Sequence, residues 1–295
     1  MTALALGLLG LILVGPGPLW VARWQFLHRV PRAAVVLWQA GAVAALVSVI
    51  GAGLVVTLPA VGRWSELDQV PVWERVAYGV LVVFTLVVVG RLSWSLITVA
   101  ATTDSRRRRH RAAVDLLGRV DESLSLPGLR VLAEQLPLAY CLPGVRGSRV
   151  VISAGTLAAL SREEVRAVVE HESAHVRARH DLVLDTFTAL HRAFPIAVRS
   201  EIPAAQCRLL VEMLADDAAR RRTGPLPLAR ALVALAGAPK PTWALGTTGI
   251  GTVERIFRLH GDPGSHRALS AAVYLLATGL VIFPVAIMVA GSTLT

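Results

Sequence analysis

The apolar residues of this chain gather into four long runs that are separated by more polar segments. Each run is long enough to cross a hydrocarbon core of about 30 Å as one helix. The runs lie at about residues 3–22, 33–58, 76–101 and 268–290. The first is interrupted by Gly15-Pro16-Gly17-Pro18, but no basic residue precedes it and no cleavage site clearly follows, so we expect a retained helix rather than a signal peptide. The pattern predicts a mainly α, multi-pass membrane protein with four transmembrane helices.

The segment between the third and fourth runs is long enough for a domain with its own core. We therefore divide the chain into residues 1–103, with three membrane helices, residues 104–267, and residues 268–295, with the fourth helix and a short tail. The central domain is expected to be α+β, because helical patterns and strand-like patterns both occur in it. Its predicted elements include helices at 107–120, 225–236 and 253–259, a strand at 129–132 and an edge hairpin within 140–153.

The central domain contains the pentad His171-Glu172-Ser173-Ala174-His175 in a stretch that is typical of a helix. Ser161 and Glu164 form a capping box, and no proline or glycine follows before His180. Two imidazoles four residues apart project from one helical face, where both can reach one Zn²⁺. Glu172 would stand beside the open position of the metal and take a proton from water. The alternative, two ordinary histidines of an Arg-rich helix, does not explain the glutamate between them.

A zinc site with two histidines needs a third protein ligand, and Glu212 is the strongest candidate. It lies in a second predicted helix, which follows Pro203 and closes with arginines before Gly224. Asp216 is one turn further along the same face, so it can orient a ligand imidazole. In the alternative reading these carboxylates lie on a solvated face and pair with arginines, which is the preferred reading for Asp217. The pattern predicts one zinc ion per chain.

These motifs resemble those of the gluzincin-type membrane metallopeptidases. The resemblance is carried by residues 150–157, 164–175 and 212–216, and it covers about residues 104–262. It is closest to the BlaR/MecR-like membrane zinc peptidases, and the HtpX-type and CaaX prenyl-protease-type enzymes come second. The resemblance implies that Glu172 is the general base and that Asp216 holds a ligand histidine. It also implies that the zinc ligands are His171, His175 and Glu212.

Two further features of the resemblance concern the substrate and the signal. Residues 140–144 and the strand at 149–153 resemble the segment near the substrate-binding edge, where a peptide can add as a further strand. The antibiotic-sensing relatives carry an extracellular penicillin-binding domain after the last membrane helix, whereas this chain stops at Thr295. It also has no Ser-x-x-Lys motif. Direct sensing of β-lactams is therefore not expected.

The chain has a net charge of +10, and several of its arginines cluster beside the apolar runs. Arg106–Arg111 follows the third run directly, and Arg23, Arg29 and Arg32 lie between the first and second runs. Positive charge of this kind marks the cytoplasmic side and anionic lipid headgroups. We therefore expect a plasma-membrane protein with both termini outside and residues 104–267 in the cytoplasm. No DNA-reading helical pair accompanies the arginines, so we expect the lipid bilayer as a partner and no direct contact with nucleic acid.

These observations predict a membrane-embedded zinc endopeptidase that hydrolyses peptide bonds on the cytoplasmic side. Its partner would be a protein or peptide substrate, and the resemblance to BlaR/MecR proteins implies cleavage of a cytoplasmic transcriptional repressor in signalling. One alternative is quality control of membrane proteins, as in HtpX. Another is a non-catalytic, metal-stabilised membrane scaffold. The residue that would stabilise the oxyanion stays open, with His191 and His260 among the candidates.

Overall fold

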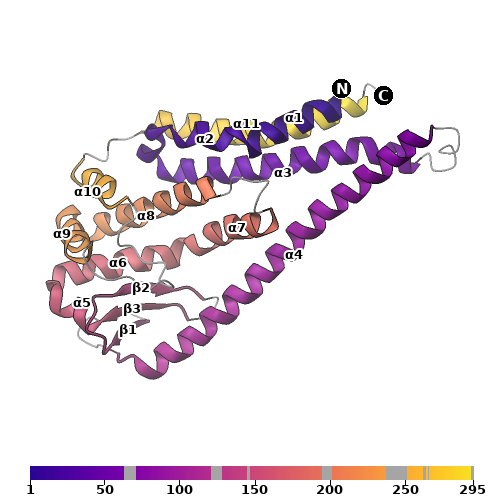
Figure 1. Cartoon of the computed structure of the whole chain (residues 1–295). Helices are drawn as coiled ribbons and strands as arrows, with labels where there is room; N and C mark the ends of the chain where they lie inside the picture. Colours follow the sequence, from indigo (N-terminus) through magenta and orange to yellow (C-terminus); the bar gives the residue numbers. More distant parts are fainter. Residues whose placement is uncertain are drawn as a thin grey trace. The chain divides into compact units, whose positions relative to one another are not determined.

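The computed structural model of the chain is mainly helical and contains one small sheet (Figure 1). The chain divides into two compact units, Met1–Val99 with Thr186–Gln206 and His266–Thr295, and Ala100–Asp185 with Cys207–Ser265. We describe each unit by itself. The structure describes residues 1–62, 71–120, 128–144, 147–194, 201–236, 251–261, 264 and 266–293.

The first unit is built from long apolar helices. Three helices in the described part of the chain are long and apolar enough to cross a membrane, which confirms three of the four predicted runs. They are α3 (Pro31–Gly62), α4 (Val72–Leu117) and α11 (Arg267–Thr293). A short 3₁₀ helix, η1 (Gln25–Arg29), precedes α3.

The first predicted run forms two helices instead of one. Helix α1 (Thr2–Val14) and helix α2 (Pro16–Ala22) meet at a bend of 46°, so a fourth span exists only if this bent pair counts as one. The break lies at Gly15-Pro16, because the ring of Pro16 removes one backbone donor and clashes with the carbonyl one turn earlier. Proline is well tolerated at the first position of the next helix, and Pro16 begins α2 there.

Helix α3 packs against α1 and α11 through small residues. A Cβ atom at Gly10 would lie 2.9 Å from Val49 Cγ2, and one at Gly51 would lie 2.7 Å from Met288 Sδ. Both contacts are shorter than real Cβ atoms show, so a larger residue at either position would require the neighbouring side chain to move. Apolar helices that meet away from water commonly use small residues in this way.

The second unit contains the sheet and the helices around it. Strands β1 (Leu129–Leu132), β2 (Ala139–Leu142) and β3 (Arg149–Ser153) are arranged in the order β1-β3-β2. Strand β3 is parallel to β1 and antiparallel to β2. The helices that follow in the chain are α5 (Ala154–Ala159), α6 (Arg162–Ala178), α7 (His180–Ala193), α8 (Glu201–Thr223), α9 (Pro225–Ala236) and α10 (Thr252–His260). The end of α7 and the start of α8 belong to the first unit, which includes Thr186–Gln206.

The sheet order corrects one prediction from the sequence. The hairpin within residues 140–153 is present, but its strand 149–153 is the central strand and has a neighbour on each side. Its backbone groups are therefore paired within the sheet, and a peptide cannot add to it. The edge of the hairpin is β2, because in the described part of the chain it pairs with β3 alone.

A second correction concerns the helix predicted at 107–120. The apolar run at 76–101 and this polar segment are one continuous helix, α4, of 46 residues. The division between the two units falls within α4, after Val99, a few residues before the predicted start of the central domain at residue 104. Residues 102–117 contain no glycine or proline that would end the helix, so α4 continues through them. The change from apolar to Arg-rich sequence therefore marks a change of surroundings along one helix.

The core of the second unit holds α6 between the sheet and helices α8 and α9. On one side, Val165 and Val169 of α6 belong to the same buried cluster as Ile152 of β3. On the other side, Ala167 shares a cluster with Ala219 of α8 and with residues of α9. The small side chains of these alanines let the helix backbones approach closely, which places the polar face of α6 against α8.

Candidate metal centre

Helix α6, which carries the pentad, has well-defined ends. Ser161 Oγ accepts from the Glu164 amide at 3.4 Å, and the Glu164 carboxylate accepts from the Ser161 amide at 2.8 Å, so the predicted capping box is present. The helix ends at Arg179, whose φ of 52° is left-handed. This turn ends α6 before His180, and His180 begins α7. His180 is therefore not an extension of the α6 face.

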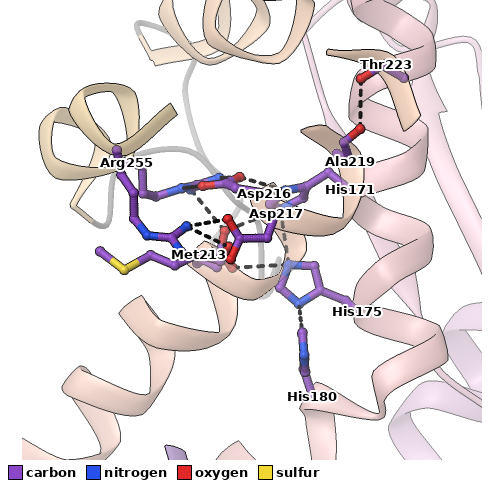
Figure 2. A network of polar contacts seen from close by, with 11 residues as sticks. His171, His175, His180, Met213, Asp216, Asp217, Ala219, Thr223 and Arg255 are labelled. Atoms are coloured by element: carbon purple, nitrogen blue, oxygen red, sulfur yellow. Dashed lines mark hydrogen bonds and ion pairs between the residues drawn. The ribbon is translucent and has the colours of Figure 1, made fainter. Parts of the chain in front are cut away.

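Three side chains from two helices, those of His171, His175 and Glu212, converge in the interior of the second unit. Figure 2 shows the two histidines of this group with their neighbours His180 and Asp216. The Nε2 atoms of His171 and His175 lie 3.1 Å apart. Glu212, from α8, places Oε2 at 3.4 Å from His171 Nε2 and Oε1 at 3.4 Å from His175 Nε2. Zinc bonds of about 2.0–2.1 Å put the donors of a tetrahedral site about 3.3 Å apart. The nitrogen and oxygen atoms present therefore fit one zinc ion in both type and spacing.

Each histidine of the cluster has a partner on its other ring nitrogen. His171 Nδ1 lies 2.9 Å from Asp216 Oδ1, and His175 Nδ1 lies 3.0 Å from His180 Nδ1. A partner at Nδ1 fixes the tautomer and the orientation of the ring, so that Nε2 presents its lone pair to a metal. Asp216 is thus where the sequence predicted it, while the contact of His180 with His175 was not predicted.

The electrostatics of the cluster follow from burial and close opposite charges. Burial opposes ionisation of Glu212, but the nearby imidazoles of His175 and His171 and the charge of Arg255 lower its pKa to about 2. Burial likewise opposes a charge on His171, yet its hydrogen bonds to Asp216 and Glu212 raise its pKa to about 9. Burial lowers the pKa of His175 to about 3. In the metal-free protein the cluster therefore holds the ionised carboxylates of Glu212 and Asp216 and two positive charges, those of His171 and Arg255.

Arg255 belongs to the cluster, although the sequence analysis did not select it. Arg255 is 0% exposed, and its guanidinium contacts the carboxylates of Glu212 and Asp216. Figure 2 shows Arg255 beside Asp216. Nε lies 2.7 Å from Asp216 Oδ2, Nη2 lies 2.7 Å from Asp216 Oδ1, and Nη1 lies 3.0 Å from Glu212 Oε2. One signal in the sequence could have indicated it. Arg255 is four residues before the buried Leu259, so it shares the inner face of α10.

Glu172 lies between the two histidines in sequence and is also 0% exposed. Cys141 of the edge strand β2 lies beside it. Burial, the charge of Glu172 and a hydrogen bond to Glu172 raise the pKa of the Cys141 thiol well above its usual value. Cys141 is therefore a neutral thiol next to the candidate general base. A buried carboxylate beside a metal position is suited to accept and return a proton.

Other residues that the sequence highlighted have different surroundings. Asp217 forms an ion pair with Arg258, as expected for a carboxylate on the outer side of α8. His260 is exposed, and its Nδ1 lies 3.0 Å from the Ile256 carbonyl of the same helix. His191 belongs to the first unit, where it lies 3.8 Å from Glu201. Neither histidine is part of the cluster at His171.

A buried pair of helical histidines, a glutamate between them and a second glutamate from a neighbouring helix define the class of metallopeptidases with a His-Glu-x-x-His helix. Residues 104–278, more than half of the chain, match the family model of Peptidase family M48. The chain belongs to this family and is a metallopeptidase. No curated protein and no solved structure matched the chain.

Proposed function

We propose that this chain is a zinc-dependent membrane endopeptidase in which His171, His175 and Glu212 hold one zinc ion and Glu172 is the general base. The observation that carries the proposal is the convergence of two imidazole nitrogens and one carboxylate at 3.1–3.4 Å from one another. Membership of Peptidase family M48 supports the same chemistry. The nucleophile is water, because the pentad supplies a base and metal ligands but no serine or cysteine activated by a histidine.

The chain's own groups account for proton transfer and for the geometry of the site. Bound zinc would polarise the peptide carbonyl and lower the pKa of water to about 7. Glu172 takes the proton from the attacking water and delivers it to the nitrogen of the leaving amine. Asp216 and His180 hold the imidazoles of His171 and His175 through their Nδ1 atoms. The burial of Glu172 keeps bulk water away from the proton that it carries.

We further propose that the substrate binds as an extended peptide along β2. Strand β2 is the sheet edge next to α6, and Cys141 of β2 lies beside Glu172. A peptide that adds to this edge brings its carbonyl groups to the zinc position. A series of substrate peptides, each with one N-methylated amide, tests this step. Alternate amides point to the strand, so KM should rise at every second position; a flat series would exclude strand addition.

The test of the catalytic proposal is Glu172→Gln, with Glu170→Gln as the matched control. Glu170 is two residues away but pairs with Arg177 and Arg222 outside the cluster. In the full chain, Glu172→Gln should retain about one zinc per chain and lose about 10²–10⁴-fold in cleavage rate. Glu170→Gln should retain both zinc and activity. Cleavage that persists unchanged in Glu172→Gln would show that another group is the base.

The cellular role that we favour is signalling by cleavage of a cytoplasmic transcriptional repressor, because the motifs resemble those of BlaR/MecR-like peptidases. Three membrane-spanning helices and the arginines that flank them support a location in the plasma membrane with the peptidase side in the cytoplasm. The alternative is HtpX-like quality control. Comparing cellular proteomes with wild type and Glu172→Gln separates the two: one repressor fragment indicates signalling, and accumulated misfolded membrane proteins indicate quality control.

A further inference from the structure

We propose that Arg255 is a positioning residue that holds Glu212 and Asp216 in the geometry of a metal site before the metal arrives. This inference rests on the proposed function, because it assigns a role to a residue around the same zinc position. Arg255 does not touch the substrate or the reacting atoms. It acts through the third ligand and through the carboxylate that orients the first histidine.

Arg255 contacts oxygen atoms of both Asp216 and Glu212. Its Nε and Nη2 atoms bind both oxygens of Asp216 at 2.7 Å, the parallel geometry in which guanidinium and carboxylate match best. Asp216 Oδ1 also faces His171 Nδ1 at 2.9 Å. The Nη1 atom forms an ion pair with Glu212 Oε2 at 3.0 Å, and Glu212 Oε1 lies 3.4 Å from His175 Nε2. One guanidinium therefore fixes both side chains of α8.

The charges of the cluster explain why a cation is needed at this place. Glu172, Glu212 and Asp216 are all buried, with exposed fractions of 0%, 6% and 1%. Carboxylates this close repel one another unless a buried cation lies between them. Among the arginines that the structure describes, Arg255 is the one that is buried. It therefore supplies the fixed positive charge that keeps these carboxylates together while no metal is bound.

The contact at Glu212 Oε2 has a consequence for metal binding. Arg255 Nη1 forms an ion pair with Oε2 at 3.0 Å, and the same oxygen lies 3.4 Å from His171 Nε2. Arg255 therefore holds the Glu212 carboxylate beside the two imidazoles that would share the metal with it. A lysine at position 255 keeps the charge but cannot bind both carboxylates, because its ammonium lacks the planar fork of arginine.

The decisive experiment compares Arg255→Lys with Arg258→Lys in the full-length protein. Arg258 is the matched control, since it is one turn further along α10 and binds Asp217 outside the cluster. The readouts are zinc affinity by competition with a chelator, the visible spectrum of the Co²⁺-loaded protein, and kcat and KM for a peptide. Arg255→Lys should weaken zinc binding by about 10–100-fold, change the Co²⁺ spectrum and lower kcat with little change in KM.

Arg258→Lys should leave zinc affinity and the Co²⁺ spectrum as in the wild type. The inference is overturned if Arg255→Lys has wild-type zinc affinity and a wild-type Co²⁺ spectrum. Because these readouts do not involve peptide cleavage, they separate this inference from the proposed base. An unchanged cleavage rate in Glu172→Gln would overturn the base alone, whereas a wild-type chain that binds no zinc would overturn both.

A loss of folding in Arg255→Lys would leave the cause open, so a second variant is needed. The double variant Arg255→Met/Asp216→Asn removes both partners of the closest buried ion pair, and Asp216→Asn alone is its reference. If Arg255 positions Glu212, the double variant should bind zinc about tenfold more weakly than Asp216→Asn. If the two variants have equal zinc affinity, Arg255 has a structural role only and the inference fails.

Discussion

The Nδ1 atom of His180 lies 3.0 Å from the Nδ1 atom of His175, although the two residues belong to different helices. The left-handed conformation of Arg179 changes the direction of the chain between the two helices, so that His180 contacts His175. Burial lowers the pKa of His180 to about 4, so both rings are neutral at pH 7. His175 turns its Nε2 toward the zinc position; its Nδ1–H is then the donor, and His180 Nδ1 is the acceptor.

Replacing His180 by phenylalanine keeps a ring of similar size and removes the acceptor. We expect zinc affinity to fall about 10-fold or more, because the imidazole of His175 loses its fixed orientation. His180→Asn retains an acceptor and should restore part of the affinity. Competition with a zinc chelator measures both. Equal affinities for His180→Phe and the wild type would mean that the contact has no role in metal binding.

Removal of zinc should lower the melting temperature of the protein, because the metal binds only the folded arrangement of the three ligands. At a free zinc concentration 1,000 times the Kd, binding stabilises the folded state by about 4 kcal/mol. Scanning calorimetry with and without a chelator measures the difference. Glu172→Gln should show the same difference as the wild type, and His175→Ala should show almost none. An effect of the chelator on His175→Ala would point to a different metal site.

The stability of the metal-free protein should depend on pH through His171. Its folded-state pKa of about 9 lies above the ordinary histidine value of about 6.5. Stability from its contacts with Asp216 and Glu212 is therefore fully present below about pH 6.5 and is lost as the pH rises through about 9. Melting temperatures of the metal-free protein from pH 6 to 10 test this. Asp216→Asn should flatten the decline; a decline of the same size in that variant would exclude His171 as its source.

The affinity for zinc should depend on pH in the opposite direction to the stability of the metal-free protein. A metal must displace the proton that His171 shares with the carboxylates, so zinc affinity should increase from pH 6 to about pH 9. Chelator competition at several pH values gives this slope directly. Asp216→Asn lowers the proton affinity of His171 and should make the slope smaller below pH 9. A slope that is the same in both proteins would contradict the assignment.

Substitution of Ser161 by alanine should destabilise the protein by about 1 kcal/mol, because it removes the side-chain acceptor of the capping box. Ser161 is exposed and lies at the N-terminal end of α6, away from the metal ligands. The kcat of Ser161→Ala should therefore stay within about twofold of the wild-type value. Ser161→Asp supplies another cap acceptor and should restore most of the stability. Denaturant unfolding and peptide cleavage measure the two effects. A large loss of kcat with normal stability would contradict a purely structural role.

The sequence predicted the parts of the site that depend on local spacing. His171, His175, Glu212 and Asp216 are pairs at i and i+4 on single helices, and the structure brings the two pairs together. The capping box and the hairpin are equally local and were also predicted. Such patterns can be read from sequence because a helix or a hairpin turn fixes which side chains share a face.

The parts that were missed depend on contacts between distant segments. Arg255 reaches the site from α10, 39 residues after Asp216, and nothing in its own neighbourhood indicates two buried carboxylates. Strand β3 is central because it also pairs with β1. That pairing is parallel, and no short turn connects the two strands. The turn at Arg179 was missed because this position in a helix end is usually glycine, whose presence would have given the signal. Length and polarity likewise suggested separate helices at 76–101 and 107–120, whereas α4 continues through both segments.

The order of the site residues along the chain has a consequence for synthesis. The two histidines leave the ribosome first, Glu212 follows, and Arg255 comes last, near the start of α11. Until residue 255 has emerged, the carboxylates of α8 lack their buried cation, and zinc would meet an incomplete set of donors. A newly made chain would therefore gain the ability to cut proteins only after residue 255 has emerged from the ribosome.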